Sequence, residues 1–173
     1  MRTPNESRDR SLQEGPRLSD PLPLVVVLDN LRSAFNVGAI FRTCEAARVS
    51  HLYLCGITPY PPNEKLERPA LGTTFRVPWS HHRETTPLLR KLRSDGTSVW
   101  AAEITPEARS LRTVTWGHNL AIVFGHETAG IDPQVLSEVD GTVQIPMHGH
   151  KNSLNVATSA GILIFEALRQ WGY

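Results

Sequence analysis

The chain of 173 residues is long enough to bury one sizeable core and fits a single domain. Its 18 Lys and Arg residues nearly balance 17 Asp and Glu residues, which argues against non-specific coating of nucleic acid but permits a local basic site. Cys44 and Cys55 are too few for a disulfide framework and too far apart for a paired metal knuckle, so we expect a cytoplasmic protein. Residues 1–20 are polar, lack the apolar centre of a secretory signal, and are expected to form a flexible leader.

The elements predicted along the chain alternate between strands and helices. Residues 24–28 (LVVVL) form a continuous apolar run, which is typical of a strand buried on both faces of a parallel sheet. We expect Asn36 to cap a helix that runs to Arg48, followed by a second strand at residues 51–55. The connection at residues 57–72 is long, polar and rich in proline, and its length suggests a working loop.

The second half of the chain continues this alternation and ends in the most apolar helix. We expect further strands at residues 75–78, 98–102, 120–124 and 142–145, and helices at residues 86–93, 132–139 and 154–171. Asn152 or Ser153 would cap the last helix, since either side chain can accept from its first free N–H groups. No segment has the length and apolarity of a membrane span. The order of elements predicts one α/β domain at residues 21–173, with a mainly parallel sheet and helices on both faces.

Three stretches rich in polar residues follow predicted strands, at residues 36–42, 125–130 and 145–157. In open α/β sheets such loops lie at one edge and build the ligand crevice. None matches a dinucleotide fingerprint or a phosphate-binding P-loop, which argues against a nicotinamide or nucleotide-triphosphate enzyme. No metal is expected either, because no Glu or Cys near His148 and His150 gives zinc spacing. Each loop alone has a plain structural explanation, but three on one edge favour a functional site.

At these loops the chain resembles a known family. Residues 36–43 (NVGAIFRT), 122–131 (IVFGHETAGI) and 145–156 (IPM…SLNV) are similar to the three ordered motifs of the SpoU (TrmH-like) branch of the SPOUT superfamily. Its members are RNA ribose 2′-O-methyltransferases that use S-adenosylmethionine. The resemblance implies a C-terminal trefoil knot and a homodimer, and the apolar last helix also favours a dimer contact. Two positions depart from the family pattern, which usually has Asn in place of His126 and Gly in place of Thr128.

The resemblance also implies which residues form the site. It places the cofactor against a set held mainly through the backbone, namely Glu103, Gly125, Ile145, Met147, Ser153 and Leu154. It places the acceptor chemistry on Asn36, Arg42, Glu127, Ser153 and Asn155. In the family the residue matching Arg42 is proposed to deprotonate the ribose hydroxyl. A guanidinium is effectively always protonated, so binding a flanking phosphate and stabilising the alkoxide is physically easier. In this interpretation Asn155 and Ser153 fix the hydroxyl and the donor, and Glu127 orients Arg42 or Asn36.

The predicted partner is RNA, with tRNA favoured over rRNA. A local basic rim would bind its backbone through Arg32, Arg48, His150 and Lys151. Two alternatives stay open. One is methylation of a base nitrogen on the same fold, which the pair of Arg42 and Asn155 disfavours. The other is a non-catalytic RNA-binding or assembly factor with a degenerate site, which the intact motif residues argue against.

Overall fold

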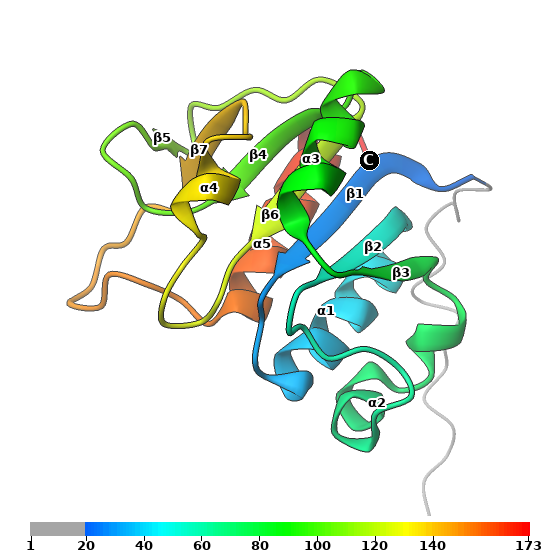
Figure 1. Cartoon of the computed structure of the whole chain (residues 1–173). Helices are drawn as coiled ribbons and strands as arrows, with labels where there is room; N and C mark the ends of the chain where they lie inside the picture. Colours follow the sequence, from blue (N-terminus) through cyan, green and yellow to red (C-terminus); the bar gives the residue numbers. More distant parts are fainter. Residues whose placement is uncertain (1–19) are drawn as a thin grey trace, which may run out of the picture.

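The computed structural model describes residues 20–173, and its centre is a sheet of seven parallel strands (Figure 1). The strands are β1 (Leu22–Asp29), β2 (Val49–Cys55), β3 (Trp79–His82), β4 (Ser98–Ala102), β5 (Arg109–Ser110), β6 (Leu120–Phe124) and β7 (Gly141–Gln144). Their order across the sheet is β3-β2-β1-β6-β4-β7-β5. The strands with the longest apolar runs, β1 and β6, therefore lie side by side near the middle, where both sheet faces are covered.

Helices cover both faces of the sheet, as the sequence predicts (Figure 1). They are α1 (Ala34–Ala46), α2 (Glu64–Ala70), α3 (Thr85–Ser94), α4 (Pro133–Leu136) and α5 (Val156–Gln170), with a 3-10 turn, η2, at Thr73–Phe75. Residues of α1, α2 and α5 share one apolar cluster with the sheet, and residues of α3 and α4 share a second cluster. The predicted α/β class with a parallel sheet is confirmed.

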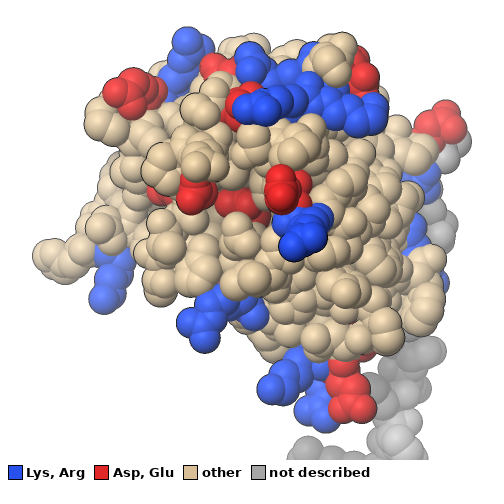
Figure 2. All heavy atoms as spheres, viewed as in Figure 1, with Lys and Arg blue, Asp and Glu red and all other residues tan. Residues whose placement is uncertain are grey.

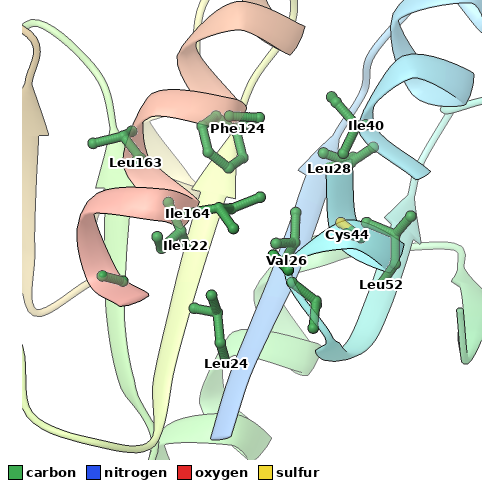
Figure 3. Packing of buried hydrophobic residues seen from close by; sticks show 14 of the residues in the cluster. Leu24, Val26, Leu28, Ile40, Cys44, Leu52, Ile122, Phe124, Leu163 and Ile164 are labelled. Carbon is green, nitrogen blue, oxygen red and sulfur yellow. The ribbon is translucent and has the colours of Figure 1, made fainter. Parts of the chain in front are cut away.

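Alternate residues of β1 supply these two apolar layers, because successive side chains of a strand point to opposite faces. Val26 belongs to the layer that contains Ile40 of α1 and Ile164 of α5 (Figure 3). Val27 belongs to the opposite layer, with Leu89 of α3. All five side chains are buried. Complete burial of one such side chain contributes about 1.5–3 kcal/mol to folding. The sheet is thus a rigid base for the loops at its edge.

The strand predicted at residues 75–78 is wrong. Residues 73–75 form the 3-10 turn, and β3 begins only at Trp79. Gly72 turns the chain here with φ of +80°, and the Thr73 hydroxyl donates to the Ala70 carbonyl at 2.7 Å. Phe75 is 90% exposed, so its strand-forming side chain finds no sheet surface to pack on. Local turn bonding overrides the strand propensity of this short segment.

Two predicted helix caps are also wrong. Ser33, not Asn36, caps α1, and its hydroxyl accepts from the Asn36 N–H at 3.2 Å. Asn155 caps α5 in place of Asn152 or Ser153. Both differences bear on the site, because the Asn36 side chain is left for tertiary contacts and Asn155 becomes fixed at a helix start.

The strand β5 has only two residues and has no hydrophobic pattern from which it could be predicted. The leader predicted at residues 1–20 lies outside the described residues except for Asp20. The trefoil knot implied by the family resemblance stays a prediction. No helix between residues 20 and 173 is long and apolar enough to cross a membrane.

Candidate active site

The candidate site lies at the carboxyl ends of the central strands. β1 pairs with β2 on one side and with β6 on the other, so the chain order reverses at β1 and β6. Open α/β sheets bind ligands at such switch points. Three loops meet there, namely residues 30–33 after β1, residues 125–131 after β6 and residues 145–155 after β7.

The carboxylate of Glu127 joins the first two of these loops. It accepts from the backbone N–H of Arg32 and of Ser33, each at 3.0 Å, and from the Asn36 side-chain amide at 3.1 Å. Arg32 and Ser33 stand at the start of α1, where backbone N–H groups lack helical partners and favour an anion. Glu127 thus connects the loop after β6 to the first helix, and its bond to Asn36 joins residues that are 91 positions apart in the sequence.

The bonding of Glu127 fixes its charge state. Partial burial raises the pKa of this carboxyl, but the N–H groups of Arg32, Ser33 and Glu127 itself, with the Asn36 amide, outweigh that effect and hold the pKa below its usual range. Glu127 is therefore ionised at neutral pH. Because its oxygens are engaged by several donors, it is suited to orienting its neighbours and poorly suited to taking a proton.

Asn155 extends the network to the third loop. Its side-chain nitrogen donates to the Asn36 oxygen at 3.1 Å across 119 residues of sequence. Its own oxygen accepts from the Ala157 N–H at 2.9 Å and from the Thr158 N–H at 3.4 Å as the cap of α5. A continuous line of hydrogen bonds, Glu127–Asn36–Asn155, therefore connects the three motifs and fixes the orientation of each amide.

A cavity of about 470 Å³ opens beside this network, between the loops after β4, β6 and β7. All residues predicted to hold the cofactor line it, namely Glu103, Gly125, Ile145, Met147, Ser153 and Leu154. The wall also contains Glu127 and Asn155, while no Lys or Arg is among the described residues that line it. With two carboxylates and no fixed cation, the cavity suits a ligand that carries positive charge better than a polyphosphate.

Glu103 holds one wall of the cavity in shape. Its two carboxylate oxygens accept from the Ile104 N–H at 2.9 Å and from the Ile131 N–H at 3.0 Å. Gly130 packs against this carboxylate with φ of +73°, and a Cβ atom there would lie 2.6 Å from the Glu103 Oε2 atom. Another residue would be strained at this φ and would displace the carboxylate.

Known proteins are similar to this chain in sequence and in fold. The model of the SpoU rRNA Methylase family matches residues 23–165. The chain belongs to this family. A tRNA (guanosine(18)-2′-O)-methyltransferase of Thermus thermophilus is 34% identical over 172 residues, which are 98% of this chain and 86% of that protein. A 23S rRNA (guanosine-2′-O-)-methyltransferase of Xanthomonas axonopodis is 32% identical over 148 residues, which are 85% of this chain and 59% of that protein.

Solved structures agree with the family assignment. An AdoMet-bound rRNA methyltransferase from Sinorhizobium meliloti superposes with a TM-score of 0.79 at 30% identity, over 89% of this chain and 57% of that one. A structure described by its insights into the 2-OH methylation of C/U34 on tRNA has a TM-score of 0.76 at 30% identity, over 86% of this chain and 95% of that one. The predicted membership of the SpoU branch is confirmed.

One predicted residue of the SpoU site, Arg42, stands apart from the others. It lies on the exposed side of α1 and is not among the residues that line the cavity. Instead it borders a second hollow of about 610 Å³, together with Phe35, Leu71 and Phe165 of α5. The structure thus brings Asn36, Glu127, Ser153 and Asn155 to one place and leaves Arg42 on a neighbouring apolar surface.

The predicted RNA-binding residues divide in the same way. Arg32, His150 and Lys151 are exposed on the loops that surround the cavity. Arg48 is exposed at the turn before β2, and its carbonyl accepts from the N–H of Leu22 at the start of β1. It therefore lies at the amino ends of the strands, on the edge opposite the site.

Sequence reasoning missed several polar residues of the cavity wall, among them Asn152 and Ser159. Ser159 follows Asn155 by four residues, and residues at this spacing share a helix face. Its position on the cavity side could therefore have been inferred once the start of α5 was placed correctly. Asn152 lies in an irregular loop, where no periodicity gives the direction of a side chain.

Proposed function

We propose that tRNA, rather than rRNA, is the substrate of this S-adenosylmethionine-dependent RNA 2′-O-methyltransferase of the SpoU family. The lengths of the matches support tRNA. The tRNA methyltransferase of Thermus thermophilus is matched over 86% of its length, and the structure concerned with C/U34 of tRNA over 95%. The rRNA enzyme of Xanthomonas axonopodis is matched over only 59% of its length.

The observation that carries the proposed cofactor binding is the cavity beside the Glu127–Asn36–Asn155 network. Its volume of about 470 Å³ lies within the range of about 300–1,000 Å³ that is usual for small-ligand sites. Its carboxylates suit the sulfonium and ammonium charges of S-adenosylmethionine. We assign the binding to Glu103, Gly125, Ile145, Met147, Ser153 and Leu154, largely through backbone groups. Bound there, the cofactor supplies an electrophilic methyl group on a cationic sulfur.

The chain's own residues would align the acceptor hydroxyl. Methyl transfer is an in-line displacement, which requires a fixed oxygen opposite the leaving sulfur. We assign this role to Ser153 and Asn155, which both line the cavity. Asn36 and the ionised Glu127 keep Asn155 in place through the bonds described above. Arg42 would bind the flanking phosphate and stabilise the charge that develops on the oxygen, while the proton of the hydroxyl passes to that phosphate or to water.

A homodimer through α5 explains the position of Arg42. The outer side of α5 exposes Ile162 and Phe165, at 37% and 49%, and Phe35 at the start of α1 is 65% exposed. Phe165, Phe35 and Arg42 border the same hollow. Burial of these partly exposed side chains by a second copy would contribute a fraction of the roughly 1.5–3 kcal/mol that complete burial of one such side chain gives. We propose that this surface is the dimer contact and that Arg42 acts on RNA at the seam between two copies.

The RNA would be bound by the basic residues near the crevice and not by the basic cluster on α3. Figure 2 shows Lys and Arg side chains gathered over the end of α3, and others standing apart along the lower edge of the molecule. On α3, Arg90, Lys91 and Arg93 are each paired with a carboxylate at 2.6–2.9 Å. Their charge is largely neutralised, so we assign the phosphate contacts to the exposed Arg32 and Lys151.

The substrate choice can be tested directly. RNA from a strain that lacks the gene should accept labelled methyl groups from the purified protein in the tRNA fraction, at the ribose of one position. Transfer to rRNA alone would overturn the tRNA proposal, and a methylated base would favour the alternative chemistry on the same fold. No transfer together with intact RNA binding would favour a non-catalytic assembly factor. The two buried free cysteines agree with the cytoplasmic location we propose for this reaction.

A further inference from the structure

His126 occupies a position where the motif usually has Asn, and the structure explains how an imidazole can serve there. Its Nδ1 atom accepts from the backbone N–H of Thr128 at 3.1 Å and from that of Ala129 at 3.2 Å. An Asn side chain forms the same kind of turn, in which its amide oxygen accepts from backbone N–H groups two or three residues later. The Nδ1 atom therefore takes the place of an amide oxygen.

These two bonds determine the form of the ring. A backbone N–H can only donate, so Nδ1 must be unprotonated to accept from Thr128 and Ala129. The proton of the neutral ring is then on Nε2. The hydroxyl of Thr128 also lies 3.3 Å from Nδ1, and with that atom as the acceptor it can only donate.

The turn closed by His126 is the one that presents Glu127. The backbone N–H and carbonyl of His126 form a pair of bonds with Gly130, at 3.1 and 2.9 Å. The far end of the turn is held by Glu103, which accepts from the Ile131 N–H. Glu127 lies between these anchors, and its carboxylate reaches Arg32, Ser33 and Asn36 on the other side of the crevice. A change in the turn would move this carboxylate first.

We propose that His126 is a positioning residue for methyl transfer, and that its Nε2-protonated ring aligns Glu127 with Asn36 by holding the turn at residues 125–130. The inference rests on the proposed function. His126 is also among the residues that line the cavity, but its bonds lie within the turn, so the role we assign to it is exerted through Glu127 and not by contact with the reacting atoms.

Two substitutions separate this role from a general need for a side chain. His126→Asn keeps an acceptor for the Thr128 and Ala129 N–H groups, and single-turnover methyl transfer should stay within about threefold of the unmodified enzyme. His126→Ala leaves both groups to solvent, and transfer should fall about tenfold or more. The control is His118→Ala. The His118 ring stacks on the Trp171 ring outside the turn, with 4.9 Å between the ring centroids, so this substitution should not change the rate. Equal rates for His126→Ala and the unmodified enzyme, or equal losses for the Asn and Ala variants, would overturn the proposal.

The protonation of the ring gives a second test that needs no activity. A long-range ¹H–¹⁵N spectrum should show His126 with a proton on Nε2 and none on Nδ1, and the signal should vanish in His126→Asn. A proton on Nδ1 would overturn the proposal even if the variants behaved as expected. If the unmodified enzyme transferred no methyl group to any RNA, the proposed function would fail, while this spectrum would still decide whether His126 closes the turn.

Discussion

Asn155 caps α5 and also belongs to the Glu127–Asn36–Asn155 network, and two substitutions can separate these roles. Asn155→Ala removes the acceptor for the Ala157 and Thr158 N–H groups and the donor to Asn36. Loss of an N-cap typically costs about 1 kcal/mol. For a domain of this size the melting temperature should fall by about 2–4 °C. Methyl transfer should fall as well, because the Asn36 oxygen loses the donor that fixes its orientation.

Asn155→Asp is the matched variant. Its carboxylate still caps α5, so the melting temperature should stay within about 1–2 °C of the unmodified protein. It cannot donate to the Asn36 oxygen, and turning the Asn36 amide would point that oxygen at Glu127. Single-turnover transfer should therefore fall about tenfold or more despite the intact fold. Thermal melting and methyl transfer are measured on both variants. Normal transfer by Asn155→Asp would refute the idea that the line of amides aligns the site.

The remaining predictions concern the cofactor, Arg42, the dimer and pH. S-adenosylmethionine at about 100 times its dissociation constant should stabilise the folded protein by about 2.7 kcal/mol, seen as a higher melting temperature, and no shift would contradict binding in the cavity. Arg42→Ala should keep the melting temperature but lower methyl transfer about a hundredfold or more. Arg42→Lys should restore little of the lost transfer. Near-normal transfer by Arg42→Ala would show that Arg42 is only a surface residue. Light scattering should give the mass of a monomer for Phe165→Glu. The control Arg90→Glu, on α3, should still give the mass of a dimer. A monomer mass for the unmodified protein would exclude the dimer. The pKa of Glu127 is lower in the folded than in the unfolded protein. Its ionised carboxylate therefore stabilises the fold at pH values above the unfolded-state pKa, and this stabilisation is lost as the pH falls through the folded-state pKa. Melting curves should therefore show Glu127→Gln approaching the unmodified protein only in acid, and a constant difference would contradict this.

The elements that were predictable from sequence are those whose residues carry their own signal. The run at residues 24–28 is apolar at every position because β1 is covered on both faces, and α3 alternates inward leucines with outward charges. Gly130 belongs to the second motif, and the structure shows its positive φ and its close approach to the Glu103 carboxylate. Such signals are local, so they can be recognised in the sequence without knowledge of the tertiary structure.

The features that could not be predicted depend on contacts between distant residues. Asn36 has the composition of a helix cap, yet Ser33 takes that role and Asn36 bonds to residues 91 and 119 positions away. Arg48 is close in sequence to Arg42 but ends at the opposite edge of the sheet, because α1 carries the chain back before β2 begins. The separation of Arg42 from the cavity follows from the same helix, whose outer side faces away from the crevice.

The most direct test of ribose methylation at this cavity uses one altered substrate. After the methylated nucleotide has been mapped, a tRNA is prepared with a 2′-deoxyribose at that position alone and is incubated with the protein and labelled S-adenosylmethionine. The hydroxyl is the only acceptor in our account, so transfer to this tRNA should be abolished while its binding to the protein changes little. Undiminished transfer to the same nucleotide would show that the methyl group goes to the base, and would contradict the account.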